Sequence, residues 1–286
     1  MRVVVFGAAG QLGADLMRAL DGLTAIAVGH DRADIADADA VDDVLRAEKP
    51  DWVVNAASMT HVDRCETDVT EAFVANAVGA RTVAVAAAAQ KARLVHISTD
   101  YVFDGRRSAP YIESDPVRPI SVYGASKAAG EFLVETCHAQ AVIARTSGLY
   151  GTSPCRGKGG ANFVDTMLRL AGERDTLRVV SDEVLTPTFT EDLAAQLRAM
   201  IDADVPAGTY HVTQSGECSW YDFAKEIFRI AGVDVKVEET TAAEWGAPAK
   251  RPAYSVLENR ALAKLGLDRM AEWNDALGRY LATRKH

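Results

Sequence analysis

The first half of the chain alternates short apolar runs with alanine-rich stretches of helical spacing. The apolar runs are Val3–Phe6, Ala25–Val28, Trp52–Asn55, Leu94–Ser98 and Val142–Arg145. The helical patterns between them are Leu12–Leu20, Ala40–Ala47, Ala72–Ala89 and Ser126–Cys137. Continuous apolar strands separated by helices are typical of a parallel sheet that is covered on both faces. With right-handed crossovers, the pattern predicts an α/β fold with a Rossmann-type doubly wound sheet over residues 1–150.

After Tyr150 the pattern becomes less regular. The glycine-rich segment Gly151–Ala161 contains Pro154, Arg156 and Lys158, which fits either a solvated connection or a lid that contacts phosphate. The later patterns predict helices at Phe163–Ala171, Tyr221–Ala231, Arg260–Leu265 and Glu272–Leu281, and strands at Leu177–Val180 and Tyr210–Val212. We expect residues 151–286 to form mainly a smaller substrate-binding lobe, with some segments returning to the sheet.

Composition narrows the class of protein. A chain of 286 residues is long enough for one large domain with a small lobe. Its formal net charge of -9 argues against a nucleic-acid or membrane partner. No run approaches ~18 consecutive apolar residues, and the N-terminal run is too short for a signal peptide. The four cysteines are widely spaced without a CxxC pair, so we expect reduced thiols, no metal site and a cytoplasmic protein.

The first motif with chemical meaning is a glycine loop, Gly7-Ala8-Ala9-Gly10-Gln11-Leu12-Gly13. Glycines let the backbone approach a pyrophosphate, which then lies on the free N–H groups of a helix N-terminus. Such loops also close ordinary strand–helix turns, so the string alone is a weak signal. Here it joins the first strand to the first helix, which is the context that nucleotide binding requires. The loop therefore predicts a dinucleotide site.

A second group of polar residues lies further along. Ser98-Thr99-Asp100 ends the fourth strand, where ligands of open α/β sheets bind. Tyr123 and Lys127 are four residues apart and share one face of a helix. A lysine cation beside a tyrosine stabilises the phenolate and lowers its pKa, so that Tyr123 can exchange a proton while Thr99 binds the substrate oxygen. A half-buried tyrosine beside a surface lysine is the alternative, and the order of the motifs disfavours it.

These motifs, taken with others, resemble the dTDP-4-dehydrorhamnose reductase family of the extended short-chain dehydrogenase/reductase superfamily. The string Leu94–Gly105 (LVHISTDYVFDG) is specific to that family, whereas the glycine loop and Tyr123–Glu131 (YGASKAAGE) belong to the wider superfamily. The resemblance extends over nearly the whole chain in the expected order. The other matching stretches are Val53–Asp63, Thr186–Thr188, Gly208–His211, Ser219–Ala224 and Arg251–Ser255.

The resemblance implies roles for individual residues. Tyr123 is the proton donor, Lys127 holds the nicotinamide ribose, and Thr99 completes the catalytic set. The implied cofactor-binding residues, besides Tyr123 and Lys127, are Gly7, Gly10, Gln11, Leu12, Asp34, Ile35, Ala57, Ser58 and Thr60. The implied substrate-binding residues are Thr99, Asp100, Gly148, Asn162, Thr186 and Arg251. Asn55, His61 and Asp63 have structural explanations, as caps or hydrogen-bonding groups of their own loop.

Two departures from the family pattern lie on the substrate side. Gly148 stands where relatives often carry a tryptophan that packs on the sugar, and Asp182-Glu183 stands where many have Asp-Gln. Gly148 predicts either a more open sugar pocket, which Trp220 or Tyr150 could fill, or a backbone that needs glycine. Both changes affect the identity of the sugar and leave the type of reaction unchanged.

The resemblance implies NAD(P)H-dependent reduction of the 4-keto group of a dTDP-linked 6-deoxyhexose, forming dTDP-L-rhamnose. Asp31 favours NADH and Arg32 favours NADPH, so we expect a loose preference that leans to NADPH. Two alternatives stay open. One is a 4-keto reductase or epimerase of another nucleotide sugar, and the other is a regulatory subunit that binds nucleotide without turnover. We expect a monomer or homodimer.

Overall fold

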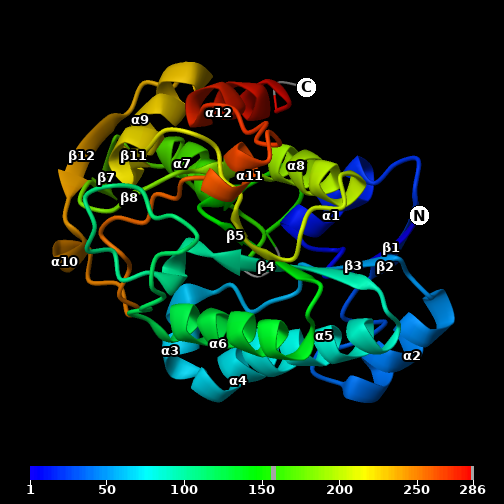
Figure 1. The fold of residues 1–286 in the computed structure, drawn as a ribbon. Helices are drawn as coiled ribbons and strands as arrows, with labels where there is room; N and C mark the ends of the chain where they lie inside the picture. Colours follow the sequence, from blue (N-terminus) through cyan, green and yellow to red (C-terminus); the bar gives the residue numbers. More distant parts are fainter. Residues whose placement is uncertain (156–158, 285–286) are drawn as a thin grey trace.

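A six-stranded parallel sheet forms the centre of the computed structural model, which describes residues 1–155 and 159–284 (Figure 1). The strand order is β10-β5-β4-β3-β1-β2, and every neighbouring pair is parallel. The order reverses at β1, which is where ligands of such sheets bind. The doubly wound fold predicted from the sequence is confirmed. The strands are β1 (Arg2–Phe6), β2 (Thr24–Val28), β3 (Trp52–Asn55), β4 (Arg93–Thr99), β5 (Ala141–Thr146) and β10 (Gly208–His211).

Helices cover both faces of the sheet, and Figure 1 shows the two layers above and below it. Alternate residues of β1 serve opposite faces: Val3 and Val5 belong to one apolar cluster, and Val4 and Phe6 to the other. One layer consists of α1 (Gln11–Ala19), α8 (Thr190–Asp202) and α11 (Arg260–Lys264). The other consists of α2 (Ala38–Glu48), α5 (Gly79–Ala89) and α6 (Val122–Cys137).

One long helix is interrupted by a π-turn. It comprises α4 (Val69–Phe73), the π-turn η1 (Val74–Val78) and α5. Together these 21 residues are long and apolar enough to cross a membrane by length and composition, although polar residues interrupt them well short of ~18 consecutive apolar residues. The helix nevertheless packs on the sheet and on α2 and α6, and 56% of its most apolar window is buried. It therefore serves as a core helix of this fold.

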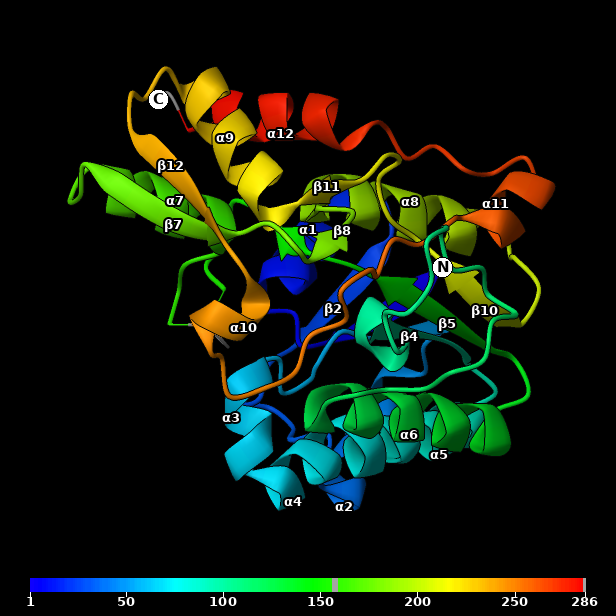
Figure 2. The same cartoon turned by 90° about the vertical axis from the view of Figure 1, so that its left-hand side faces the viewer.

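A second apolar core lies beside the sheet, at the end that carries the C-terminus (Figure 2). Its helices pack around the parallel pair of β7 and β12. The helices and strands of this lobe are α7 (Phe163–Ala171), β7 (Thr176–Val180), α9 (Trp220–Ala231), β12 (Lys236–Thr240), α10 (Ala242–Trp245) and α12 (Trp273–Ala282). Shorter elements are α3 (Val62–Thr67), η2 (Asp100–Val102), β6 (Leu149–Tyr150), β8 (Val184–Leu185), β9 (Thr188–Phe189) and β11 (Cys218–Ser219).

The two cores do not follow a single cut in the sequence. Helix α8 and strand β10 come after Tyr150, yet they pack in the first core, as do residues of α11. A division into residues 1–150 and 151–286 stays a prediction. The segments that return to the first core are exceptions to it. Helix α8 and strand β12 were not predicted. Arg156 and Lys158 of the suggested phosphate lid lie outside the described residues.

Candidate active site

The glycine loop brings β1 against the segment that follows β3. Gly7 has a φ of +76°, and a Cβ there would lie 2.7 Å from the Ala57 nitrogen. A Cβ on Gly13 would overlap the carbonyl oxygen of Gly7. Gly10 caps α1 without a side-chain hydrogen bond, so the first N–H groups of the helix have no side-chain partner from the cap. The loop thus has the backbone geometry that an anion site needs, and phosphate binding by Gly7, Gly10, Gln11 and Leu12 stays a prediction.

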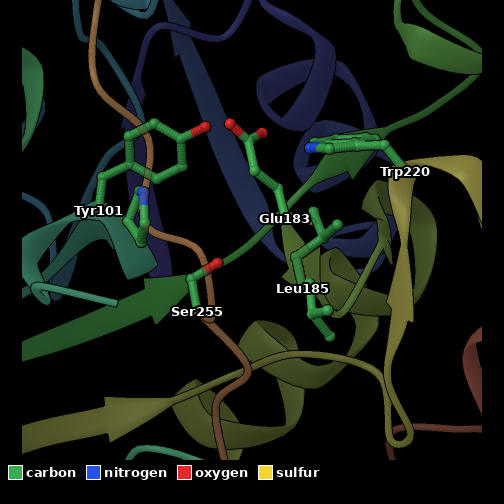
Figure 3. A pocket seen from close by; sticks show the side chains of 7 residues that line it. Tyr101, Glu183, Leu185, Trp220 and Ser255 are labelled. Carbon is green, nitrogen blue, oxygen red and sulfur yellow. The ribbon is translucent and has the colours of Figure 1, made fainter. Parts of the chain in front are cut away.

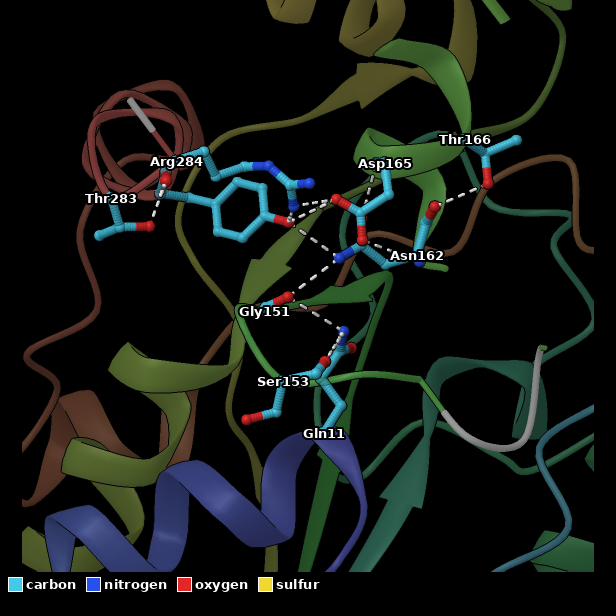
Figure 4. A network of polar contacts seen from close by, with 9 residues as sticks. Gln11, Gly151, Ser153, Asn162, Asp165, Thr166, Thr283 and Arg284 are labelled. Carbon is cyan, nitrogen blue, oxygen red and sulfur yellow. Dashed lines mark hydrogen bonds and ion pairs between the residues drawn. The ribbon is translucent and has the colours of Figure 1, made fainter. Parts of the chain in front are cut away.

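Gln11 and Asn162, two side chains predicted to bind ligands, form hydrogen bonds to other residues of the protein (Figure 4). The Nε2 atom of Gln11 donates to the carbonyl oxygens of Gly151 and Ser153 at 3.2 and 3.1 Å. The Nδ2 atom of Asn162 donates to the same Gly151 oxygen and to the Tyr280 hydroxyl, both at 3.0 Å. The Oδ1 atom of Asn162 caps α7. These bonds join α1 to the second lobe, and a contact between Asn162 and a nucleotide sugar stays a prediction.

The loop after β3 is held from a distant helix. Ala57, Ser58 and Thr60 are partly buried there. Asn76, in the π-turn, accepts a hydrogen bond from the Met59 nitrogen at 2.8 Å and donates to the Met59 oxygen at 3.1 Å. π-Turns are frequent at functional sites. Asn76 was not predicted from the sequence, and it positions the loop that is predicted to line the cofactor.

Residues near the end of β2 would border the adenosine part of a dinucleotide. Asp34 is exposed and accepts a hydrogen bond from the Ala36 nitrogen at 2.9 Å, whereas Ile35 is buried against α5. Arg32 pairs with Glu48, with 2.6 Å between Nη2 and Oε1. Both side chains of this pair are partly exposed, so the guanidinium can exchange Glu48 for a ligand phosphate at little cost.

The predicted catalytic residues meet at the carboxyl end of β4. Thr99 is the last residue of β4, and Tyr123 and Lys127 lie on the first turns of α6. A hydrogen bond joins the hydroxyl groups of Thr99 and Tyr123. Lys127 is buried and donates from Nζ to the Ile97 oxygen at 2.7 Å. The structure therefore brings the three residues together as predicted from their spacing.

The electrostatics of this group differ from the expectation. Burial raises the pKa of Tyr123 above its ordinary value, and the lysine does not offset this shift. The prediction that the cation lowers the pKa of Tyr123 is wrong for this structure, because the ammonium of Lys127 is directed to the Ile97 oxygen. Burial lowers the pKa of Lys127 to about 8, against the opposing effect of Glu131. Near pH 7 the tyrosine is protonated and the lysine is charged.

Asp100 is buried beside Thr99 and has three hydroxyl partners. Its carboxylate accepts hydrogen bonds from Thr99 at 3.0 Å, Ser147 at 2.9 Å and Ser255 at 2.6 Å. Burial raises its pKa to about 6, and the three hydroxyl donors oppose that shift. The carboxylate thus joins β4 to the segment around Ser255. Direct contact between Asp100 and a substrate stays a prediction.

Arg251 and Thr186 also have internal partners. The Arg251 guanidinium pairs with Asp63 at 3.0 Å and donates to the Ala249 oxygen at 3.0 Å. Asp63 therefore connects α3 to the second lobe, beyond the local role expected for it. The Thr186 hydroxyl donates to the Gly216 oxygen at 2.7 Å. Contact of Arg251 and Thr186 with a nucleotide sugar stays a prediction.

A small pocket lies between the Tyr101 side of the sheet and the second lobe (Figure 3). Glu183 points into it between the Tyr101 ring and the Trp220 indole. Burial raises the pKa of Glu183 to about 7, while the nearby Arg251 acts in the opposite direction. The rings of Tyr101 and Tyr123 meet edge to face with centroids 5.6 Å apart, so the pocket adjoins the predicted proton donor. The sequence resemblance places Glu183 on the substrate side without implying a role for it.

Of the two explanations for Gly148, the structure supports the one in which the backbone needs glycine, and an open sugar pocket stays a prediction. Gly148 has a φ of +53°, and a Cβ there would lie 2.7 Å from Leu185 Cδ1 and 3.2 Å from Pro187 Cα. A Cβ at this position would require the end of the Leu185 side chain to shift, and the backbone conformation itself favours glycine. Tyr150 is fully buried in the second core and is not available to a sugar. Trp220 packs on Phe163 and also lines the pocket of Glu183.

No group of three or more His, Cys, Asp or Glu side chains in residues 1–155 and 159–284 is arranged to hold a metal ion. Cys65, Cys137 and Cys218 form no disulfide bond in the part of the chain that the structure describes. The polar groups of the site are therefore the hydroxyl, amide, carboxylate and ammonium groups already described.

Known proteins match this chain over nearly its full length. The model of the RmlD substrate binding domain matches residues 1–285. The spore coat polysaccharide biosynthesis protein SpsK of Bacillus subtilis is 42% identical over 285 residues, which are 99% of this chain and 98% of SpsK.

Solved structures give the same picture. The dTDP-4-dehydrorhamnose reductase of Clostridium acetobutylicum superposes with a TM-score of 0.95 at 42% identity, covering 100% of both chains. The dTDP-4-dehydrorhamnose reductase of Bacillus anthracis, solved in complex with NADP, has a TM-score of 0.94 at 40% identity over 99% of both chains. The resemblance noted in the sequence is thus confirmed in backbone geometry.

Proposed function

The chain belongs to the RmlD substrate binding domain family, and we propose that it reduces the 4-keto group of a dTDP-linked 6-deoxyhexose, forming dTDP-L-rhamnose from dTDP-4-dehydrorhamnose. The observation that carries the proposal is the meeting of Thr99, Tyr123 and Lys127 at the carboxyl end of β4. Relatives that superpose over the full chain are named for the same reaction.

Each residue of this group has a task in ketone reduction. Tyr123 is protonated near pH 7 because burial raises its pKa, so it donates a proton to the ketone oxygen. Thr99 lies within hydrogen-bond reach of Tyr123 and orients that oxygen. Lys127 carries a positive charge at the Ile97 oxygen of β4, from where it binds the ribose of the cofactor. The nicotinamide cofactor, when bound, supplies the hydride.

The chain's own residues fit a dinucleotide. The glycine loop presents N–H groups at the N-terminus of α1 without a side-chain cap, which suits a pyrophosphate, and Asn76 holds the loop after β3 at Met59. NADPH and NADH are both accepted, with a lean to NADPH because Arg32 can bind a 2′-phosphate. The Bacillus anthracis relative was solved with NADP, which supports the same lean.

The test is an activity screen with the purified full-length chain. A panel of nucleotide-linked 4-keto sugars is offered with NADPH or NADH, and oxidation of the cofactor is followed by its absorbance. The proposal expects fastest turnover with dTDP-4-dehydrorhamnose and a dTDP-L-rhamnose product. Faster turnover of another 4-keto sugar would favour a different nucleotide-sugar reductase. Tight cofactor binding without turnover of any panel member would favour a regulatory subunit.

The proposed reaction also leads to expectations for the cellular location and the oligomeric state of the enzyme. Substrate and cofactor are soluble metabolites, so the enzyme works in the cytoplasm as a monomer or homodimer, with residues 1–150 contributing most of the cofactor site. Size-exclusion chromatography with light scattering distinguishes the two assembly states.

A further inference from the structure

Helix α3 is only six residues long, and contacts on several sides fix its place. The His61 side chain caps its N-terminus by accepting a backbone hydrogen bond at 3.2 Å. Asp63 accepts hydrogen bonds from the Arg251 guanidinium and, at 3.1 Å, from the Ala249 nitrogen. The Cys65 side chain is fully buried. Because so short a helix has little stability of its own, these contacts determine where its other side chains point.

Glu66 of this helix reaches the start of α6, beside which α3 lies (Figures 1 and 2). Its Oε1 atom accepts a hydrogen bond from the Val122 nitrogen at 2.8 Å. Val122 is the first residue of α6, and Tyr123 is the second. The first N–H groups of a helix have no partner within the helix, and the positive end of the helix attracts a carboxylate. Glu66 therefore holds the backbone at the residue that precedes the proton donor.

The first turn of α6 is also restrained on its other sides. Ser121 is the N-cap and accepts a hydrogen bond from the Gly124 nitrogen at 3.2 Å. A Cβ on Gly124 would lie 2.2 Å from the Tyr101 carbonyl oxygen, so the turn packs closely against that segment. Ser121 belongs to the same stretch of chain as the turn, whereas Glu66 lies 56 residues away in the sequence. The Glu66 contact therefore fixes this turn relative to a separate element of the fold.

We propose that Glu66 is a positioning residue for Tyr123, because its carboxylate fixes the first turn of α6 and so places the Tyr123 hydroxyl beside Thr99. The inference rests on the proposed function, since it takes Tyr123 to be the proton donor in ketone reduction. Glu66 acts through the backbone of Val122 and does not donate the proton itself. A displacement of about 1 Å in a reacting group can lower a rate about 100-fold, so a contact outside the reacting atoms is able to control turnover.

The first experiment is steady-state kinetics with NADPH and dTDP-4-dehydrorhamnose. We expect Glu66→Ala to lower kcat about 10-fold to 100-fold. The KM for NADPH should change by less than about 3-fold, because Lys127 remains bonded to the Ile97 oxygen. Glu66→Gln keeps an acceptor oxygen for the Val122 nitrogen and should retain most of kcat. Glu135→Ala, which removes an exposed acid from the far end of α6, is the matched control and should leave kcat unchanged.

A second arm shows whether Glu66 acts through Tyr123. In a Tyr123→Phe background the positioned hydroxyl is absent, so Glu66→Ala should lower the residual turnover by less than about 2-fold. An equal loss of kcat in both backgrounds overturns the assignment, as does wild-type kcat in Glu66→Ala. If Glu66→Ala does not fold, Glu66→Asp gives the same two measurements, because its side chain is one methylene shorter and keeps the charge.

Hydrogen exchange measured by mass spectrometry tests the contact without turnover. The backbone amides at the start of α6 should exchange faster in Glu66→Ala than in the wild type and in Glu135→Ala, since the Val122 N–H loses its partner. A wild type that reduces no ketone would overturn the proposed function. In that case faster exchange in Glu66→Ala would still support the role of Glu66 in fixing α6, and unchanged exchange would overturn that role as well.

Discussion

The Nζ atom of Lys127 lies 2.7 Å from the carbonyl oxygen of Ile97, two residues before the end of β4. This hydrogen bond ties the first turns of α6 to the strand that carries Thr99. It also satisfies one proton of a buried ammonium group, which would otherwise be expensive to remove from water. The charge of the lysine is therefore held at a defined place on β4, before any ligand arrives.

We predict that Tyr123→Phe folds, binds NADPH and loses most of its turnover. The change removes the hydroxyl group that donates the proton and leaves the ring that meets Tyr101. General acid catalysis is typically worth about 10²–10⁴-fold, so kcat should fall within that range. Steady-state kinetics and fluorescence titration of NADPH measure both properties. Tyr221→Phe, in the second lobe, is the control, and near wild-type kcat in Tyr123→Phe would mean that another group donates the proton.

Lys127 should set the alkaline side of the pH profile. Burial lowers its pKa to about 8, so the ammonium form is present below that pH and disappears above it. The pKa of Tyr123 is raised, so the tyrosine remains a proton donor throughout this range. We therefore expect kcat/KM to decline as the pH rises through about 8.

The alkaline decline of kcat/KM can be tested with Lys127→Arg, whose guanidinium stays charged at every accessible pH. It should lower activity, because its shape differs, and should move the alkaline decline to higher pH. An unchanged alkaline limb in Lys127→Arg would show that a different group titrates there. Melting curves over the same pH range control for unfolding.

The parts of the site that depend on local patterns could be predicted from the sequence. The glycine loop needs only a strand, a turn and a helix in succession, and Tyr123 and Lys127 share a face because they are four residues apart. Helix α8 also had a local signal, since Leu193, Leu197 and Met200 recur at helical spacing and are all buried. Its beginning carries no capping signal, because Phe189 stands at the N-cap position and provides no side-chain hydrogen bond.

Other parts depend on contacts between distant segments. Asn76 bonds to Met59, 17 residues away, and to Ser126, 50 residues away, so its role has no signature in its own surroundings. The same holds for the burial of Glu183, whose neighbours Tyr101 and Trp220 come from other elements. The pKa of Tyr123 was misjudged for a related reason: spacing places Lys127 on the same helix face but does not give the direction of its ammonium group.

We predict that Asn76→Ala weakens cofactor binding without removing catalytic groups. The change leaves the Met59 N–H and carbonyl oxygen without their side-chain partners, at a cost of about 1–3 kcal/mol. The loop at Ala57–Thr60 should then be less ordered, so the KM for NADPH rises more than kcat falls. Kinetics with saturating sugar measure this split. Asn274→Ala, at an exposed position, is the control, and an unchanged KM for NADPH would contradict the assigned role.

Cofactor preference should respond to Arg32. This guanidinium pairs with Glu48 across a partly exposed surface and is free to turn to a 2′-phosphate. We expect the wild type to prefer NADPH by less than about 1000-fold, which corresponds to on the order of 4 kcal/mol. Arg32→Ala should raise the KM for NADPH by about 10-fold and leave the KM for NADH nearly unchanged. A wild type that uses NADH more than about 1000-fold better would contradict the lean to NADPH.

Gly148→Trp should destabilise the protein, because the site has neither the backbone freedom nor the space for a side chain. A residue with a Cβ at a φ of +53° is strained by about 1–2 kcal/mol. The Cβ would also press on Leu185 Cδ1 and approach the backbone of Pro187. Denaturant unfolding of Gly148→Ala and Gly148→Trp measures the two contributions together.

Gly232→Ala isolates the backbone contribution. Gly232 has a similar φ of +67°, but no atom lies within 4 Å of the position of its Cβ. Its alanine variant should therefore lose only the strain of about 1–2 kcal/mol, whereas Gly148→Ala should lose more because it is also crowded. If Gly148→Trp is as stable as the wild type and binds dTDP-L-rhamnose at least as well, space must exist beside Gly148 and the crowding argument fails. If both glycine-to-alanine variants lose equally, Leu185 moves aside and strain alone explains why glycine is needed at position 148.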